Sequence, residues 1–165
     1  MRIRTLVSVC TQLVALGVIG AAFFLRVPHV LGLSMEPRIH SGDFVLINTL
    51  AYRLGSIRRG DIVAFRHNSP TPQIYLKRVV GLPGDRVSIE RGNVRIDGQP
   101  LEERYVRYRD AQSRAAVTVP SDGVYVLGDN RANSDDSRNW GVLPRHDIIG
   151  KAIGTLWPFE ELAAP

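Results

Sequence analysis

A long apolar segment near the N-terminus constrains the fold of this chain more than any other feature. It covers residues 5–25, carries no charge, and lies between Arg4 and Arg26. As a helix it would be about 30 Å long, which is the thickness of the hydrocarbon core of a bilayer. The segment therefore predicts a single crossing of a membrane.

The charges beside this segment predict its orientation. Arg2 and Arg4 form a short positive flank, and such flanks stay in the cytoplasm. We therefore expect a cytoplasmic N-terminus over residues 1–4, a transmembrane anchor over residues 5–25, and an extracytoplasmic domain over residues 26–165.

A cleaved secretory signal peptide is the alternative interpretation of the same segment. Gly20, Ala21 and Ala22 supply the small residues of a cleavage site. The apolar run is longer than the ~7 to 15 residues usual in a signal peptide, which favours a retained anchor. Thr11 and Gln12 reduce its hydrophobicity and keep both interpretations open.

Length, cysteine content and charge limit the remaining classes. A chain of 165 residues suits one ordinary domain rather than two. Cys10 is the single cysteine, so neither an intramolecular disulfide nor a cysteine metal cluster can form. The formal net charge of +5 would suit nucleic acid, but the arginines are scattered from Arg38 to Arg145, which argues against that partner. A basic exterior is equally compatible with anionic lipid headgroups.

Beyond residue 26 the pattern changes to short alternating runs bounded by Gly, Pro, Asn and Asp, which is typical of β-strands. We therefore predict a mainly β domain. The predicted strands are residues 43–47, 62–66, 74–80, 86–90, 93–96, 117–119, 124–127 and 148–156. Residues 91–92 and 97–98 are predicted to reverse the chain. We expect a short helical turn over residues 49–54 and a solvated loop over residues 102–114.

Four segments combine turn-forming residues with groups that can do chemistry. They are GLSMEPR at residues 32–38, SGDFVLIN at 41–48, YLKRVVGLPGD at 75–85 and GDNRANSDDSRNWG at 128–141. Ser34 in the first segment is a candidate nucleophile, which requires a base. The four histidines lie in no nucleophile elbow or metal motif and are expected at the surface, which argues against a Ser/His/Asp triad.

Lysine is the more informative candidate base. The chain has nineteen arginines but only two lysines, Lys77 and Lys151. Arginine stays protonated, whereas a desolvated lysine can accept a proton. Strand alternation places Lys77 on one face with Tyr75, and Arg78 on the other. Burial of the Lys77 face would lower its pKa from ~10.4 towards neutrality. A lysine that extends its amine to solvent is the alternative.

In this order, the segments resemble the signature boxes of bacterial type I signal peptidases, which are serine proteases with a Ser/Lys dyad. SMEPR is similar to the nucleophile box Ser-Met-x-Pro-Thr, KRVVGLPGD to the lysine box, and GDNRANSDDSR to the Gly-Asp-Asn-Arg box. The resemblance covers most of residues 5–158. It implies an antiparallel β catalytic domain behind one transmembrane helix in the bacterial inner membrane. Such enzymes remove signal peptides from secretory precursors, and the resemblance implies no cofactor and no metal.

The resemblance also implies roles for individual residues. Ser34 would attack the scissile carbonyl, forming an acyl-enzyme, and Lys77 would be its general base. Ser134 matches the hydroxyl that orients the lysine amine. Three charged residues would brace the site by ion pairing: Asp129, Asp136 and Arg138.

For the substrate, the resemblance implies an extended precursor strand, with shallow pockets for an Ala-x-Ala-like site. The matching apolar wall residues are Val30, Met35, Ile39, Tyr75 and Leu76. Core packing is an equally weighted interpretation of each. The implied partners are signal-peptide-bearing precursors and the lipid bilayer, with no nucleic acid, and no oligomeric state is predicted.

Two positions depart from the family pattern. Arg38 replaces the usual threonine after Ser-Met-x-Pro, which affects the expected local geometry. Gly32 stands where some members have a serine, so the oxyanion hole would need the Ser34 backbone N–H and another donor. The acidic run of residues 129, 135 and 136 could instead hold a cation, but it lacks the glycine and closing glutamate of a calcium loop.

Other proteins are compatible with parts of this pattern. A conjugation-type pilin-processing peptidase shares the dyad, but the complete GDNRANSDDSR segment favours a signal peptidase. A mitochondrial inner-membrane peptidase is comparably short, and Asn130 with Arg131 favours the bacterial type. A self-cleaving repressor would need a DNA-binding helix-turn-helix in place of the apolar segment. A non-enzymatic anchored β-domain is the remaining alternative.

Overall fold

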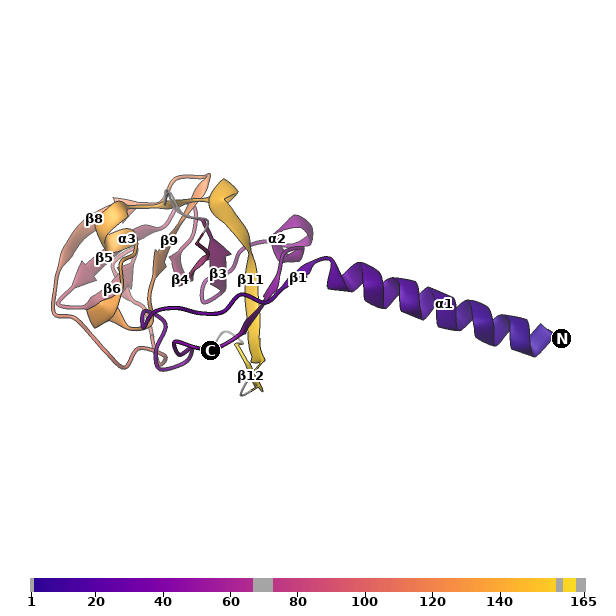
Figure 1. Cartoon of the computed structure of the whole chain (residues 1–165). Coiled ribbons are helices and arrows are strands. Elements are labelled where there is room, and N and C mark those ends of the chain that lie inside the picture. Colours follow the sequence, from indigo (N-terminus) through magenta and orange to yellow (C-terminus); the bar gives the residue numbers. More distant parts are fainter. Residues whose placement is uncertain (1, 67–72, 157–158, 163–165) are drawn as a thin grey trace.

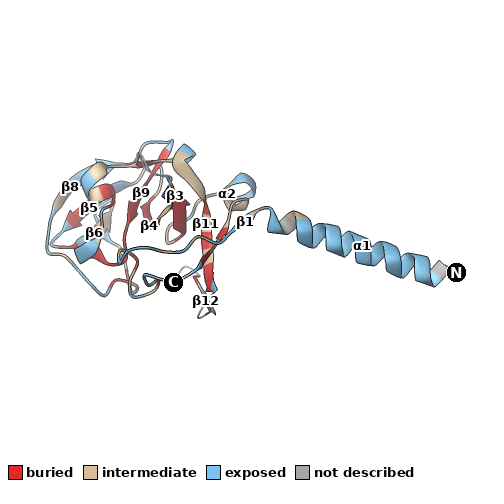
Figure 2. Ribbon diagram, in the orientation of Figure 1, coloured by how far each residue is buried: buried red, intermediate tan, exposed pale blue. Residues whose placement is uncertain are grey.

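The computed structural model describes residues 2–66, 73–156 and 159–162. Figure 1 shows the N-terminal helix α1 (Arg2–Ala22) projecting from a body built of β-strands. The stretch Ile3–Gly20 has a mean hydropathy of 1.7 and is long and apolar enough to cross a membrane. Figure 2 shows this helix exposed rather than packed against the body. Its apolar side chains therefore do not enter the core formed by the described residues of the body.

The helix ends before the predicted span of residues 5–25 does. Phe23 and Phe24 form a turn, and the next two residues are strand β1 (Leu25–Arg26). This strand pairs antiparallel with β2 (Val45–Asn48). Leu25, predicted to lie in the anchor, is therefore part of the sheet, because its backbone pairs with that of Asn48.

The larger sheet has eight strands, in the order β1-β2-β11-β3-β4-β9-β10, with β12 paired to β11. All of its pairings are antiparallel. The strands not yet given are β3 (Ile62–Phe65), β4 (Tyr75–Gly81), β9 (Gly123–Leu127), β10 (Leu143–Pro144), β11 (Ile148–Leu156) and β12 (Phe159–Glu161). Strand β4 lies between β3 and β9, so both of its edges are paired.

A smaller antiparallel sheet has the order β7-β6-β5-β8. Its strands are β5 (Arg86–Glu90), β6 (Asn93–Ile96), β7 (Gln99–Pro100) and β8 (Arg114–Thr118). Arg91 and Gly92, with φ of 48° and 79°, form the turn between β5 and β6. Asp97 and Gly98 form the next turn in the same conformation, at 51° and 80°. The two predicted reversals are confirmed, because tight hairpins favour positive φ at both central residues.

The prediction of a mainly β, antiparallel fold behind one N-terminal helix is confirmed. Strands β5, β6 and β11 have the predicted bounds, and the other predicted strands appear within a few residues of theirs. The short helices are α2 (Ala51–Leu54), which falls in the predicted turn, α3 (Ser137–Trp140), and the 3-10 helices η1 (Arg131–Asn133) and η2 (Arg145–Asp147). Strands β1, β7, β10 and β12 were not predicted.

The prediction of a fully solvated loop over residues 102–114 is wrong in part. The loop is irregular, but Glu103 and Val106 are buried. The ring of Tyr105 lies 4.2 Å from the guanidinium carbon of Arg78, a residue of β4. The loop is therefore packed against the body by a few of its side chains while the others face water.

Candidate active site

Ser34 and Lys77 are brought together although they are 43 positions apart in the chain. Lys77 Nζ lies 2.7 Å from Ser34 Oγ, within hydrogen-bonding distance. Lys77 is near the middle of β4, where its backbone pairs with that of Val63 in β3. Ser34 lies in the irregular segment that leads to β2. The rigid strand therefore positions the amine, and the segment brings the hydroxyl to it.

Burial lowers the pKa of the Lys77 amine. Lys77 is only 4% exposed. Desolvation lowers its pKa to about 8, although the nearby carboxylates of Asp136 and Asp135 act in the opposite direction. Near neutral pH the neutral amine is therefore an accessible form, and it can accept a proton.

The segment of residues 128–130 holds the Ser34 loop in place. The Asn130 backbone N–H donates to the Ser34 carbonyl oxygen at 3.0 Å. The Asn130 side-chain amide donates to the Leu33 carbonyl oxygen at 3.1 Å. A Cβ at Gly128 would clash with the Ser34 carbonyl oxygen and with Ser134 Oγ, so only glycine fits there. Asn130 was noted in the sequence only as part of a box, without this role.

Asp129 forms a fully buried ion pair with Arg78. The Arg78 guanidinium donates to both carboxylate oxygens, at 2.8 Å from Nε and 2.6 Å from Nη2. A third hydrogen bond joins Arg78 Nη1 to the Gly60 carbonyl oxygen at 2.8 Å. Both side chains are 0% exposed. Arg78 follows Lys77 directly in β4, so both faces of this strand are buried rather than only the one that carries the lysine.

Asp136 and Arg138 form a second braced pair beside the lysine. Arg138 donates to Asp136 through Nε and Nη2, both at 2.8 Å, and Asp136 also accepts from the Gly128 N–H at 3.0 Å. Burial acts to raise the pKa of Asp136, but these hydrogen bonds and the Arg138 charge hold that pKa below its usual value. Asp135, by contrast, accepts from Asn139 at 2.9 Å. The carboxylates of the acidic run therefore have separate partners.

Ser134 lies beside this pair rather than on the lysine. Its Oγ is buried close to Gly128, and no hydrogen bond of regular geometry joins it to the residues that the structure describes. The hydroxyl is still near enough to the Asp136 carboxylate to help lower its pKa. Of the residues implied by the resemblance, Ser134 is thus the one whose expected contact with Lys77 is not formed.

The loop of residues 102–114 supplies two carboxylates that sequence reasoning missed. Glu103 pairs with Arg131, at 3.0 Å and 2.5 Å between guanidinium nitrogens and carboxylate oxygens. Arg131 also donates from Nε to the Gly128 carbonyl oxygen at 2.9 Å. Asp110 forms an ion pair with Arg138. The charge of the loop was visible in the sequence, but no local pattern indicated these partners.

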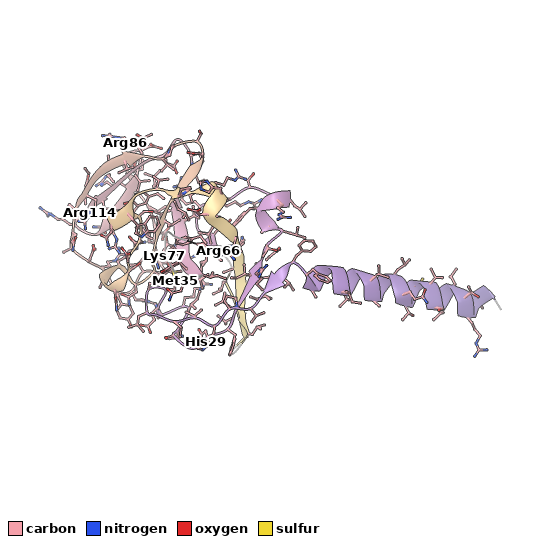
Figure 3. All side chains as sticks on the ribbon, turned by 45° about the horizontal axis from the view of Figure 1, so that its top comes forward. His29, Met35, Arg66, Lys77, Arg86 and Arg114 are labelled. Atoms are coloured by element: carbon pink, nitrogen blue, oxygen red, sulfur yellow. The ribbon has the colours of Figure 1, made fainter. Side chains whose placement is uncertain are left out.

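Two hollows meet at Ser34 and Lys77. The smaller, about 60 Å³, is lined by apolar side chains that include Val30, Met35 and Leu76. The other, about 280 Å³, is lined by Phe65, Trp140 and Asn133 among others. Tyr75 borders both hollows. Figure 3 shows Met35 close to Lys77. The remaining expected wall residue, Ile39, is 0% exposed, belongs to the core, and does not line either hollow.

Backbone conformation explains Gly32. Its φ is 119°, a conformation that residues with a Cβ rarely adopt. Its N–H donates to Ser41 Oγ at 3.3 Å. The Ser34 N–H donates no hydrogen bond within the described part of the chain. That N–H is therefore available to a substrate carbonyl.

No described histidine is part of the dyad, although His29 lines the smaller hollow. His29, His40 and His146 are exposed, as the sequence predicted. His67 lies outside the described residues. None of the three is hydrogen-bonded to the Ser34 hydroxyl, whose described partner is Lys77.

Comparison with known proteins identifies the family to which this chain belongs. Residues 3–157 match the family described as "Signal peptidase, peptidase S26". The chain belongs to the signal peptidase family, peptidase S26. The resemblance expected from the sequence is thereby confirmed, and the chain is a hydrolase of the peptidase class.

Several curated signal peptidases are similar over most of their length. "Signal peptidase I" of Leptolyngbya laminosa is 40% identical over 136 residues, which cover 78% of this chain and 67% of the relative. "Probable signal peptidase I-2" of Synechocystis is 37% identical, with coverages of 91% and 70%. A crystal structure of a signal peptidase I from Enterococcus faecalis is 32% identical, with a TM-score of 0.49, and covers 59% of this chain and 97% of that one.

Proposed function

We propose that this chain is a membrane-anchored signal peptidase that removes N-terminal signal peptides from secretory precursors at small-residue, Ala-x-Ala-like sites. Ser34 is the nucleophile and Lys77 the general base. The observation that carries the proposal is the distance of 2.7 Å between Ser34 Oγ and a buried Lys77 Nζ whose pKa is lowered to about 8. A lysine held in this way can activate a serine without histidine.

The reaction would proceed in two stages. The Ser34 hydroxyl gives its proton to the neutral Lys77 amine as Oγ bonds to the scissile carbonyl carbon. The protonated amine then gives that proton to the leaving nitrogen as the peptide bond breaks. This leaves an acyl-enzyme on Ser34. A water gives its proton to Lys77 as its oxygen attacks the ester, and the proton returns to Ser34 when the ester bond breaks.

The bracing residues keep this site rigid and electrically balanced. Asp129 and Asp136 are each neutralised by an arginine, Arg78 and Arg138. Preorganised groups of this kind do not have to rearrange during the reaction. The Ser34 N–H is one oxyanion donor, and we assign Ser134, whose hydroxyl lies near Asp136, to orient the lysine amine when substrate is bound.

The proposed preference for small residues at the cleavage site agrees with the size of the smaller hollow beside the nucleophile. Its volume of about 60 Å³ accepts small side chains such as alanine. Val30, Met35, Tyr75 and Leu76 would contact the residues before the cleavage point. Ile39, packed in the core, would support this wall from behind.

The membrane placement follows from α1 and its flank. The helix would hold the enzyme in the bacterial inner membrane by one crossing, with Arg2 and Arg4 on the cytoplasmic side. The β body would then lie on the extracytoplasmic side, where precursors emerge.

Purified full-length protein in detergent, supplied with a secretory precursor, tests the proposal. Wild type should cut after the small-residue site, while Ser34→Ala and Lys77→Met should not. Lys77→Arg should also fail to cut, because arginine stays protonated. Lys151→Arg is the matched control, because Lys151 is the other lysine and an arginine there keeps a cation beside the buried Asp61 carboxylate, which Lys151 contacts at 2.6 Å. Cutting by Lys77→Met, or an equal loss in Lys77→Arg and Lys151→Arg, would overturn the assignment of Lys77.

A further inference from the structure

A cationic groove lies on the body away from the dyad. It has a volume of about 490 Å³ and borders α2, η2 and the start of β11. Its charged lining residues are Arg26, Arg53, Arg66, Arg145, His146 and Asp147. The arginines come from segments far apart in the chain, so the fold itself gathers them. The lining contains four guanidinium groups and one carboxylate, which leaves the groove strongly positive.

These arginines are unlike the arginines of the active site. Arg78, Arg131 and Arg138 each pair with a carboxylate. No ion pair joins the four groove arginines to a carboxylate in residues 2–66, 73–156 or 159–162. The one carboxylate of the lining, Asp147, has its Oδ1 atom 3.5 Å from Nε2 of His146. Gathered charges of one sign repel one another, and an anion bound among them removes that repulsion.

An apolar hollow of about 350 Å³ is built from the same segments as one end of this groove. Phe24, Leu25, Leu50 and Leu54 line it. Leu54 is 83% exposed, although it is a large apolar side chain. Residues of β1 and of α2 with its preceding turn contribute to both sites: Leu25 lines the hollow and the next residue lines the groove. The two linings alternate along residues 24–26 and 48–54, so the charged site and the apolar site flank the same short segments.

Both sites lie close to the end of α1. Arg26 is four residues beyond Ala22, which places it within about 14 Å of the helix end. Figure 1 shows β1 and α2 at the end of the body that faces the helix. If α1 crosses the bilayer, this end of the body is at the level of the lipid headgroups.

We propose that the cationic groove and the apolar hollow together bind one anionic phospholipid. The groove holds its phosphate and the hollow takes the first part of an acyl chain. This goes beyond peptidase activity and rests on the proposed membrane anchorage. A free phosphate would use the groove alone, so the apolar hollow is what favours a lipid.

Native mass spectrometry of the full-length protein in detergent can measure the binding. The probes are phosphatidylglycerol, phosphatidylcholine with the same chains, and glycerol phosphate. Arg53→Ala/Arg145→Ala should bind phosphatidylglycerol about thirtyfold more weakly than wild type, at about fivefold for each arginine. Arg86→Ala/Arg114→Ala is the charge-matched control and should bind as wild type does, because Figure 3 shows these residues at the end of the body away from α1.

Further variants separate the outcomes. Leu54→Ser should weaken phosphatidylglycerol but leave glycerol phosphate unchanged. Equal binding of phosphatidylglycerol and phosphatidylcholine, or an equal loss in both double variants, would overturn the proposal. So would glycerol phosphate binding as tightly as the lipid, which would make the groove a free-anion site. Cleavage of a soluble peptide by Arg53→Ala/Arg145→Ala reports correct folding, and its absence in wild type would count against the peptidase proposal alone.

Discussion

At the scale of single residues, Lys77 shows how a strand position becomes reactive. Both edges of β4 are paired, and both of its faces are covered. The amine therefore loses water and has the Ser34 hydroxyl as its close partner. Arg78, the next residue, keeps its charge at 0% exposure because Asp129 neutralises it. Adjacent cations in one strand thus behave oppositely because one has a paired carboxylate and the other does not.

The first prediction concerns the pH dependence of catalysis. Only neutral Lys77 can accept the Ser34 proton, so kcat/KM for a short peptide should rise with pH through about 8 and then level off. Asp135 raises the pKa of Lys77, so Asp135→Asn should move this rise to lower pH. Asp122→Asn, a change of an exposed carboxylate that is not among those acting on Lys77, is the control and should leave the profile unchanged. A flat profile would contradict the assignment of the base.

The second prediction is that Lys77→Met inactivates the enzyme but stabilises it. Below pH 8 the folded protein must bury a charged amine or release its proton, and the shift from 10.5 to about 8 is worth about 3 kcal/mol. Losing the hydrogen bond to Ser34 offsets about 1 kcal/mol of this. At pH 7 the variant should therefore unfold with a free energy about 2 kcal/mol higher than wild type, measured by denaturant titration.

The sign of this effect changes with pH. Between pH 8 and 10.5 the unfolded wild type binds a proton that the folded protein does not, so the stability of wild type rises with pH. The advantage of the variant should shrink across this window, reach zero at a pH above about 9.5, and become a deficit of up to about 1 kcal/mol, from the lost hydrogen bond, at the upper end. A constant difference from pH 7 to 10.5 would show that the desolvation of Lys77 is not its cause.

At the scale of elements, the loop of residues 102–114 holds the segment of residues 128–141 in place through ion pairs. Glu103 pairs with Arg131, and Asp110 pairs with Arg138. Both arginines belong to the segment of residues 128–141, which also contacts the Ser34 carbonyl oxygen through the Asn130 N–H. An irregular loop therefore helps to set the position of the nucleophile.

The third prediction compares two neighbouring glutamates of this loop. Glu103 and Arg131 have side-chain exposures of 1% and 2%, so Glu103→Gln leaves a buried guanidinium without its charge partner. It should destabilise the protein by about 3 to 5 kcal/mol, measured from the urea midpoint in detergent. Glu102 pairs with Arg104 at exposures of 73% and 80%, and Glu102→Gln should change stability by no more than about 1 kcal/mol. Equal losses of stability in the two variants would contradict this role of the Glu103–Arg131 pair.

The extent to which sequence predicts these elements depends on the range of their interactions. Strand β11 was predicted from local alternation, and the turn at Arg91 from its chemistry, because both signals lie within a few residues. Two-residue strands such as β1 have too few positions to alternate. Ser34 and Lys77 were identified by their boxes. The burial of Glu103 depends on Arg131, 28 residues away, and no local pattern contains that information.

At the scale of the whole molecule, the link between anchor and body is short. Two turn residues separate α1 from β1, and β1 is fixed to β2 by antiparallel pairing. Ser34 is twelve positions beyond Ala22, the last residue of α1, which limits the nucleophile to about 43 Å from the end of the helix. If α1 is the membrane anchor proposed above, the sheet keeps the active site within this distance of the bilayer surface. A precursor held in the same membrane then presents its cleavage site at a high effective concentration.

The fourth prediction tests this tether in the complete chain. Eight alternating glycine and serine residues inserted between Ala22 and Phe23 would let the body move up to about 28 Å farther from the helix. Cleavage of a membrane-inserted precursor in liposomes should slow severalfold, because the effective concentration falls as the linker lengthens. The kcat/KM for a short soluble peptide should not change, since Ser34 and Lys77 are untouched. The same eight residues appended at the C-terminus are the control and should alter neither rate. If the insertion slowed both substrates equally, the body itself would be disturbed, and if it slowed neither, the position of the active site relative to the membrane would not contribute to cleavage.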